Sequence, residues 1–572
     1  MDNQRVFIWA ALALVLYLNF ITWQKDYAPP PAPASAATTQ TPSATGTAPA
    51  AANDTLPELP SSDATAPPAS ASGTSAATIN ESNQETVAGN AAVIRVVTDV
   101  LSMDISTRGG ELVRADLLKY PVKKNQPDVP VRLFTPNPPL YVARSGLRAA
   151  DGRAEPTHQV TYQAAASEYK LEAGQQELVV PLTWTDGQGV TVTKTFKFKP
   201  GSYQVDLSYD VDNQSGSDYK AASYVQLIRH YEHIERSYFN VETYAYRGPA
   251  IFDGKAYRKL KIEDEDDRKF KGDFAGGWMA SLQHHFVAAA VPPKDATYDY
   301  QLSLDADNDF VLSYRGPLTA VPTGGKHTFN ETIFVGPKLQ EQLAQAGPRL
   351  ELVADYGKLT IIAQPLFTVL EFVYGVVGNW GWAIIIVTFL IKLAFYKLTA
   401  SSGRSMAKMR NLGPRIKQIQ ERYKDDREQL GRQMMEIYKR EKINPLAGCL
   451  PILIQIPFFL AFYWVLLESV EMRQAPFLGW ITDLSSRDPF FILPILMAGA
   501  MFAQFKLQPM PSTDPVQAKI FMFMPLIMSV TMAWFPAGLV LYWLTNTLLS
   551  IAQQYRINKL VAAEDKKEKD RS

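Results

Sequence analysis

A series of apolar segments separated by charged loops dominates the last third of the chain and limits how it can fold. Five segments carry few charged residues, and each approaches the roughly 20 residues that a helix needs to cross a bilayer. The last two are separated only by the tight turn WFPAG, which predicts a helical hairpin. The predicted spans are 379–398, 450–467, 489–505, 520–535 and 537–552.

The beginning of the chain combines another apolar run with a long stretch of low complexity. Residues 6–22 are uncharged and apolar, so 1–26 is predicted to be a transmembrane anchor. A cleaved secretory signal is the alternative, because small residues follow at 32–37. Residues 27–89 are rich in Pro, Ala, Ser and Thr, which predicts a disordered tether.

The middle of the chain, 90–347, follows a different pattern. Short β-branched and aromatic alternations such as GVTVTKTFKFKPGSYQVDLSYDV are interrupted by turn residues. This period of two over such a length predicts a large antiparallel β-sandwich. The expected fold class is therefore a multi-domain membrane protein, in which an all-β domain accompanies a polytopic α-helical bundle.

The distribution of basic residues predicts the orientation in the membrane. The loop 401–444 contains 12 Lys and Arg residues, whereas the loop 471–488 contains only two. By the positive-inside rule, the first loop is cytoplasmic and the second is not. The charged tail 561–572 and the N-terminus are then cytoplasmic, and the β-domain is periplasmic. Within 348–378, the segment 364–378 suits an amphipathic helix lying at the membrane interface.

Several kinds of chemistry find no support in the sequence. No G-x-x-x-x-G-K-[ST] phosphate loop occurs, all six histidines lie before residue 328, and the single cysteine is Cys449. The pairs His230–His233 and His284–His285 lack a clear third ligand, so no metal site is expected. A net charge of zero gives no indication of DNA binding. We expect neither an enzyme nor a cofactor.

Lys392 is the one charged residue well inside a predicted span, between Thr388 and Tyr396. A lysine at the centre of a membrane helix costs about 2.5–3.5 kcal/mol on insertion, so such residues usually face a cavity or a bundle interior. The spacing i, i+4, i+8 places these three side chains on one stripe of a continuous helix. The alternative, equally compatible with the pattern, is that Lys392 extends to the cytoplasmic interface.

Other predicted spans also contain polar or aromatic residues. Gln455, Gln504, Thr545 and Asn546 could line a wet groove with Lys392, although hydrogen bonding between neighbouring helices is their commoner use. Tyr542 and Trp543 could form part of the groove wall or pack against neighbouring helices, and packing is favoured.

The basic loop 401–444 has the apolar spacing of two amphipathic helices, with a turn at Asp425 and Asp426. Its first part is either a solvated helical hairpin or a docking surface for the ribosome, lipid headgroups or targeting factors. The basic residues of the predicted docking surface are Arg404, Lys408, Arg410, Arg415 and Lys417.

Four stretches resemble the YidC/Oxa/Alb family of membrane protein insertases, and together they extend through most of 380–559. They are SMAKMRNLGPRIKQIQERY, EKINPLAGCLPILIQIPFFLAFYWVL, APFLGWITDLSSRDPFFILPILM and WFPAGLVLYW. The anchor, tether and β-domain look like the Gram-negative version, whose periplasmic domain is a β-supersandwich similar to sugar mutarotases.

The resemblance implies a membrane protein insertase and chaperone with a hydrophilic groove open to the cytoplasm and to lipid. Lys392 matches the family's groove charge, which is usually arginine, while Gln455 and Trp543 match groove positions. Ile456 and Phe459 match the helix along which substrates slide, paired with 520–535. The partners implied are nascent membrane proteins, the Sec translocon, the ribosome and signal recognition particle pathway, and membrane lipids, in a bacterial inner membrane.

Two other functions remain open on sequence alone. A small-molecule transporter or channel with a periplasmic sensing domain would also need polar residues within its spans, although no internal repeat is visible. A tethered carbohydrate enzyme would place the chemistry in the β-domain.

Overall fold

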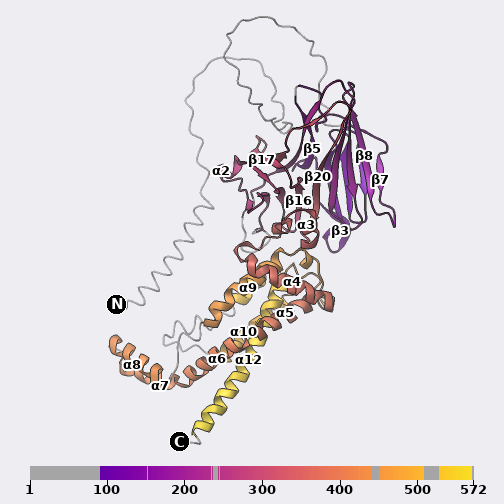
Figure 1. Ribbon diagram of the computed structural model, residues 1–572. Helices are drawn as coiled ribbons and strands as arrows, with labels where there is room; N and C mark the ends of the chain where they lie inside the picture. The colour runs from indigo at the N-terminus through magenta and orange to yellow at the C-terminus, as the bar shows by residue number, and fades with distance from the viewer. Residues whose placement is uncertain are drawn as a thin grey trace, which may run out of the picture. The chain divides into compact units, whose positions relative to one another are not determined.

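The computed structural model describes residues 91–150, 152–233, 235, 243, 245–423, 426–440, 450–507, 523 and 527–569. The predicted anchor and tether, and most of the predicted span 520–535, lie outside these residues. The described chain has a β-rich region followed by a helical region (Figure 1).

The first sheet of the β-rich region has 11 strands and follows the order β14-β17-β18-β11-β5-β3-β2-β1-β7, with β4 paired to β3 and β19 to β11. Its strands are β1 (Val93–Val97), β2 (Leu101–Ser106), β3 (Glu111–Lys123), β4 (Gln126–Arg132), β5 (Tyr141–Ala149), β7 (Glu168–Lys170), β11 (Tyr219–His230), β14 (Lys271–Ala275), β17 (Thr297–Leu304), β18 (Asp309–Arg315) and β19 (Thr319–Val321).

The second sheet has nine strands in the order β13-β12-β15-β16-β20-β10-β9-β8-β6. Its strands are β6 (Gln163–Ala164), β8 (Leu178–Thr185), β9 (Val190–Phe198), β10 (Gln204–Asn213), β12 (Gly248–Phe252), β13 (Tyr257–Lys259), β15 (Trp278–Leu282), β16 (Phe286–Val291) and β20 (Lys326–Pro337). The helix α2 (Glu265–Arg268) precedes β14. Both sheets are antiparallel, apart from the parallel pair of β1 and β7.

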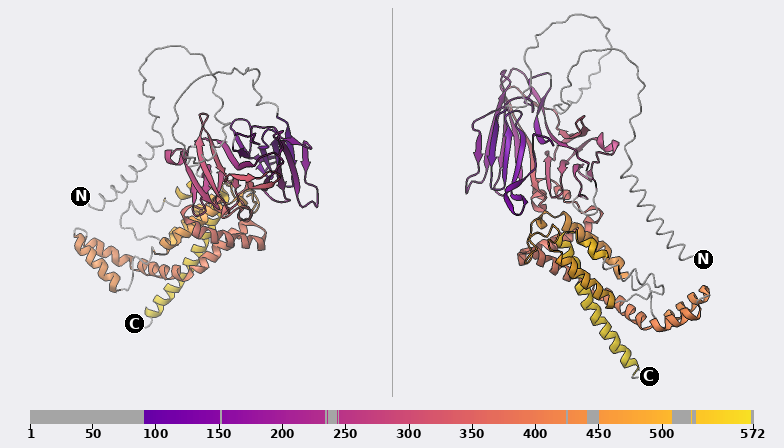
Figure 2. Two further views of the ribbon diagram at one scale, coloured as in Figure 1. Left: turned by 45° about the horizontal axis from the view of Figure 1, so that its top comes forward. Right: turned by 180° about the vertical axis from the view of Figure 1, so that it is seen from behind.

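Alternating side chains explain why the sheets stack. In β10, Val205, Leu207, Tyr209 and Val211 are buried, while the residues between them are more exposed. These side chains join one core cluster with residues of the other sheet, and full burial of each such apolar side chain contributes roughly 1.5–3 kcal/mol. The predicted antiparallel sandwich is thereby confirmed. Figure 2 shows its strands from two further sides.

A lysine is fully buried inside this core. The ammonium of Lys194, on β9, donates to the carbonyls of Gly109, Gly110 and Ser145 at 2.7, 3.1 and 3.1 Å and to the Ser145 hydroxyl at 2.9 Å. Burial lowers the pKa of Lys194 to about 7. The side chain therefore ties β9 to the turn before β3 and to β5.

The helical region begins with α3 (Gln340–Ala346), η3 (Leu350–Val353) and η4 (Gly357–Leu359). It continues with α4 (Thr360–Val377), α5 (Trp380–Ala394), α6 (Tyr396–Asn411), α7 (Gly413–Arg422), α8 (Arg427–Arg440), α9 (Leu450–Glu468), η6 (Val470–Met472), α10 (Ile492–Leu507) and α12 (Ala537–Lys569). Helices α4, α5, α9, α10 and α12 share one apolar core cluster and run close together in Figures 1 and 2.

Capping residues set several helix starts and ends. The side chain of Asn379 accepts from the Trp382 amide at the start of α5, and Gly378 ends α4 in the left-handed conformation with φ 66°. The Asp488 carboxylate accepts from the amides of Phe490 and Leu493. This cap makes α10 begin at Ile492, later than the start of the predicted span 489–505.

The helix expected across 379–398 is not continuous, while the membrane span itself stays a prediction. Helix α5 ends at Ala394, and the chain resumes as α6 after a bend of 62°. Phe395, with φ −90° and ψ 7°, leaves the helical conformation, and no Pro or Gly marks this position in the sequence. Tyr396 consequently begins a new helix, so it does not continue the stripe of Thr388 and Lys392.

Two other helices differ in length from the predictions. Helix α12 runs to Lys569 and so includes most of the charged tail 561–572, whose Ala, Glu and Lys residues have high helix propensity. Helix α4 covers the predicted interfacial segment and begins four residues earlier. Its side chains Ile361, Phe372 and Val376 are 84%, 72% and 73% exposed, which indicates an apolar surface that requires a nonaqueous neighbour.

Among the described residues, α4 alone is long and apolar enough to cross a membrane as one unbroken helix. The bent pair formed by α5 and the start of α6 also meets these criteria when taken together, and α9 and α10 contain shorter apolar helices. The polytopic bundle therefore stays a prediction.

Candidate functional site

Lys392 lies near the end of α5 and reaches toward α12. Its ammonium donates to the hydroxyl of Ser550 at 2.8 Å, and this hydroxyl donates in turn to the Asn546 carbonyl one helical turn earlier, at 2.7 Å. Among the described residues, no carboxylate forms an ion pair with Lys392. The cation is therefore held by a neutral hydroxyl and keeps its charge uncompensated in this part of the structure.

A third helix extends this polar contact. The side-chain amide of Gln455, on α9, donates to the Asn546 side-chain oxygen at 3.4 Å. Gln455, Asn546, Ser550 and Lys392 thus form a polar line across α9, α12 and α5. The sequence singled out three of these residues. It missed Ser550, whose only signal is its spacing of four residues from Asn546.

Other predicted groove residues lie in different settings. Thr388 is buried, and its hydroxyl donates to the Ile384 carbonyl within α5 at 2.6 Å. The backbone carbonyl of Tyr396 accepts from Gln553 at 3.4 Å. Gln504 is partly buried near the end of α10. Among the described residues, it forms no hydrogen bond with the polar line on α5, α9 and α12.

Aromatic residues surround the α9 side of the polar line. The Phe459 ring stacks on Tyr542 with centroids 5.6 Å apart and meets Trp543 edge-on at 4.6 Å. Tyr542 is buried in the helical core. Ile456, one turn before, is 44% exposed, so α9 presents an apolar side chain next to its polar one.

The predicted amphipathic hairpin forms around its own apolar cluster. Leu412, Ile416 and Ile437 are buried where α7 packs on α8, so the apolar faces of the two helices meet. Of the predicted docking residues, Arg404 and Arg415 are exposed. Lys408, Arg410 and Lys417 belong to α6 and α7, and their side chains lie outside the described part of the chain.

The end of α9 is held by the β-rich region. His284 and His285, between β15 and β16, both donate from Nε2 to the Leu467 carbonyl, at 3.1 and 3.3 Å. Burial lowers the pKa of His284 to about 2 and that of His285 to about 3, so both rings are neutral. This pair therefore caps the end of α9. Within the described residues, no three His, Cys, Asp or Glu residues are grouped as metal ligands would be.

Contacts after α9 extend this attachment. Val470 belongs to the core of the sandwich, Arg473 donates to the Pro121 carbonyl at 2.8 Å, and Lys124 donates to the Thr482 carbonyl at 2.5 Å. Lys338 is buried at the end of β20 and lines a cavity of about 100 Å³ with Glu468, the last residue of α9. No sequence pattern indicated these contacts, because each joins residues more than a hundred positions apart.

Two protein-family models match this chain, one over most of the helical region and the other mainly over the β-rich region. Residues 372–565 match the family model described as 60Kd inner membrane protein, and residues 93–369 match the YidC periplasmic domain. The chain is 44% identical to the membrane protein insertase YidC of Pseudomonas putida (strain W619) over 99% of this chain and 100% of that relative. It is 46% identical to the one of Thioalkalivibrio sulfidiphilus (strain HL-EbGR7), with the same two coverages.

A solved structure of an active YidC insertase with its first transmembrane domain resolved covers 81% of this chain and 93% of its own, at 18% identity and a TM-score of 0.35. The two family models and the curated relatives define an inner-membrane protein with a periplasmic domain. The chain belongs to the YidC family of membrane protein insertases.

Proposed function

We propose that this chain inserts newly made hydrophobic segments into the bacterial inner membrane and assists their folding, alone or with the Sec translocon. The observation that carries the proposal is the Lys392 ammonium, which binds the Ser550 hydroxyl and no described carboxylate. Such a cation can attract an acidic residue of a substrate without first breaking an ion pair. Lys392, Gln455 and Trp543 would line a groove open to the cytoplasm and to lipid, together with Thr388, Tyr396, Gln504 and Tyr542.

The energetics of insertion favour this arrangement. Each Leu, Ile, Phe or Val contributes roughly 0.3–0.6 kcal/mol at the bilayer centre, so an apolar segment enters without nucleotide. The obstacle is its polar flank, which must cross hydrocarbon. Two opposite charges 4 Å apart attract by about 4 kcal/mol at an effective dielectric constant near 20, enough to offset much of this cost. Lysine supplies a point charge, which suits attraction without a bidentate geometry.

Helix α9 provides an apolar path beside the cation. Ile456 is exposed and Phe459 packs against Trp543, so an incoming helix could contact the first and be guided past the second. We propose that these two residues, with 520–535, form the surface along which substrates slide into lipid.

The remaining organisation belongs to the same proposal. The division is an anchor (1–26), a tether (27–89), a periplasmic β-domain (90–347), an interfacial region (348–378), a membrane core (379–560) and a cytoplasmic tail (561–572), with both termini cytoplasmic. Within the core, the loop 401–444 would dock the ribosome, the signal recognition particle pathway or lipid headgroups through its basic residues. The exposure of Arg404 and Arg415 supports such contacts.

The test compares Lys392→Ala, Lys392→Arg and Ser550→Ala in cells depleted of their own insertase. We expect Lys392→Ala to slow the insertion of a substrate with an acidic translocated end about tenfold, equivalent to ~1.4 kcal/mol. Lys392→Arg should restore the rate, and Ser550→Ala should change it little, because the hydroxyl only positions the ammonium. Insertion is measured by protease protection of the translocated end.

Lys397→Ala is the matched control, since this exposed lysine lies five residues further along the chain. A substrate with a neutral translocated end serves as the second control, because its insertion should not depend on the cation. Equal insertion of the acidic substrate by Lys392→Ala and Lys397→Ala would remove Lys392 from the mechanism.

A further inference from the structure

A cavity of about 180 Å³ lies in the β-rich region, remote in sequence from the polar line of the helices. It opens where β5 begins and β11 ends, and it also borders the start of β12 and the turn after β15. At ~30 Å³ for each water molecule, the volume holds about six waters, which suits a small molecule and not a folded chain segment.

Two arginines that form no ion pair with a described carboxylate provide the positive charge of this cavity. Arg229 donates to the Leu282 carbonyl at 2.9 Å and lies over the Tyr141 ring at 4.9 Å. Burial and the neighbouring Arg247 both lower the pKa of Arg229, whereas Tyr141 and the Glu232 carboxylate raise it. The Arg247 cation is therefore close enough to repel Arg229. In the described part of the chain, neither arginine forms an ion pair.

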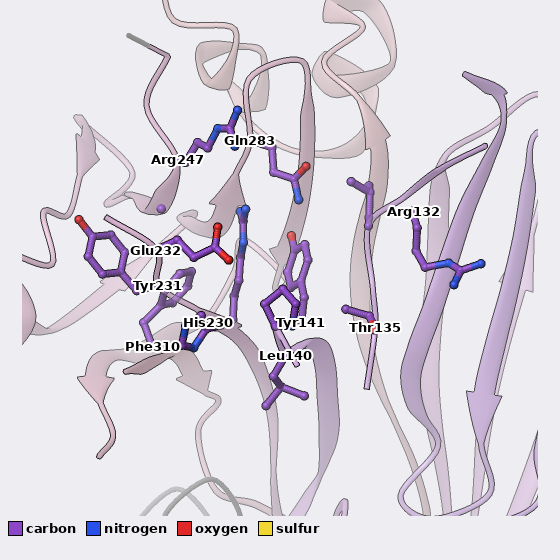
Figure 3. A pocket seen from close by; sticks show the side chains of 14 residues that line it. Arg132, Thr135, Leu140, Tyr141, His230, Tyr231, Glu232, Arg247, Gln283 and Phe310 are labelled. Atoms are coloured by element: carbon purple, nitrogen blue, oxygen red, sulfur yellow. The ribbon is translucent and has the colours of Figure 1, made fainter. Parts of the chain in front are cut away.

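Two other charged or titratable groups of the lining, Arg132 and His230, are each bonded to a carboxylate. Arg132 donates to the Asp116 carboxylate at 2.7 Å, and its guanidinium points away from the cavity in Figure 3. His230 is bonded to Asp309 at 2.8 Å. Glu232 is exposed and is the one carboxylate of the described lining, so the two arginines leave a net positive charge.

The neutral groups favour a ligand with hydroxyls. Figure 3 shows the polar ends of Glu232, Gln283 and Tyr141 turned toward the same space, with the Arg247 side chain above it. The Gln283 amide can donate and accept, and the Glu232 carboxylate can accept, which suits hydroxyl groups. Leu140 and Phe310 supply apolar walls for a short carbon skeleton.

We propose that this cavity binds a small polyhydroxylated organic anion, whose acid group lies between Arg229 and Arg247 and whose hydroxyls face Gln283 and Glu232. Guanidinium groups bind carboxylates and phosphates through paired hydrogen bonds, and an anion here would relieve the repulsion between the two arginines. The acid group would be a carboxylate or a phosphate, since both match this geometry. The site is independent of the insertion mechanism proposed above.

The experiment measures binding to the full-length protein in nanodiscs of zwitterionic lipid by isothermal titration calorimetry. Gluconate and sorbitol form a matched pair, because they share a six-carbon polyol skeleton and differ in the carboxylate. Glycerol 3-phosphate and inorganic phosphate form a second pair, which tests the phosphate and the need for hydroxyls. We expect at least one of the two organic anions to bind about tenfold more tightly than sorbitol and than inorganic phosphate, and the tighter one identifies the acid group.

Three variants are expected to change the affinity for the more tightly bound organic anion in different ways. Arg247→Gln should weaken its binding about tenfold, because one of the two charged donors is lost. Glu232→Gln should tighten it several-fold, because the negative charge that repels the ligand's acid group is removed while the amide oxygen can still accept from a hydroxyl. Arg132→Gln changes the net charge equally but should alter the affinity less than twofold, since its guanidinium faces Asp116.

Several results would overturn the proposal. One is that sorbitol or inorganic phosphate binds as tightly as both organic anions, and another is that neither organic anion binds. A third is that Arg247→Gln and Arg132→Gln weaken the binding of the anion equally. Circular dichroism of each variant checks its fold, and Arg229→Lys, which keeps the charge, replaces Arg247→Gln if that variant fails to fold.

Discussion

The β-rich region and the helical region each contain a lysine whose ammonium lies in apolar surroundings. Lys194 and Lys392 are both lysines held by neutral oxygen acceptors, but their settings differ. Four acceptors enclose Lys194 in the sandwich, whereas one hydroxyl binds Lys392 between two helices. The first is therefore structural, and the second keeps bonding capacity for another partner.

Replacing Lys194 tests this difference. Lys194→Met removes the shared donor of three backbone carbonyls, and each unpaired buried acceptor costs about 1–3 kcal/mol. We expect the free energy of unfolding of the β-rich region to fall by about 3 kcal/mol, measured by pulse proteolysis of the full-length protein in urea. Lys197→Met, on the same strand and more exposed, should cost under about 0.5 kcal/mol. Equal stability of the two variants would mean that the desolvation of Lys194 cancels its hydrogen bonds.

At the scale of elements, the attachment of α9 to the turn between β15 and β16 is the main feature that the sequence did not predict. Period-two alternation predicted the strands, because each strand buries every second residue locally. No local pattern could pair His284 with Leu467, since the contact depends on how two distant elements meet. The break after Ala394 was equally hidden, because no Pro or Gly marks it.

The neutral histidine pair predicts an acid-sensitive attachment. With the attachment formed, the pKa values of His284 and His285 are about 2 and 3, below the ordinary value of 6.5. When the contact with Leu467 is broken and the rings are exposed, the two histidines therefore bind more protons below pH 6.5 than they do in the attached state. Stability of the attachment is therefore full above pH 6.5 and is lost as the pH falls, by up to ~1.4 kcal/mol per pH unit for each ring.

We expect hydrogen exchange of the amides at 465–475, corrected for its intrinsic pH dependence, to show less protection at pH 5.0 than at pH 7.5. A variant with His284→Gln and His285→Gln should lose less protection over this interval, because glutamine does not titrate. The same loss in both proteins would assign the acid sensitivity to other groups.

On the scale of the whole molecule, the sequence predicted the β-rich and helical regions and the residues of the polar line, except Ser550. It did not predict where the two regions join. After β20, Leu350 and Val353 still belong to the core of the sandwich, whereas Tyr356 is buried in the helical core. The change from one core to the other therefore falls between Val353 and Tyr356. The polar line itself could be predicted in part, because a charge within an apolar run is visible without tertiary information.

This junction predicts different outcomes for two deletions. Deleting 91–330 keeps Tyr356 and its neighbours, so we expect insertion to continue at a reduced rate. Deleting 91–356 removes a buried aromatic from the helical core, and loss of a large core side chain costs about 3–5 kcal/mol, so insertion should be lost. Complementation of a depletion strain measures both, with membrane abundance as the control. Activity that disappeared equally in both would instead favour a β-domain required for the activity itself.

Because the Leu467 carbonyl near its end is bonded to the sandwich, α9 can tilt more easily than it can translate along its axis. At 1.5 Å per residue, Phe459 lies about 12 Å from this pivot and Leu450 about 26 Å. A tilt of about 10° would then move Phe459 by ~2 Å and the far end by more than ~4 Å, while Leu467 stays in place. Under the proposed function, substrates of different width would then fit beside the Leu450 end of α9 without disturbing the attachment of Leu467 to the sandwich.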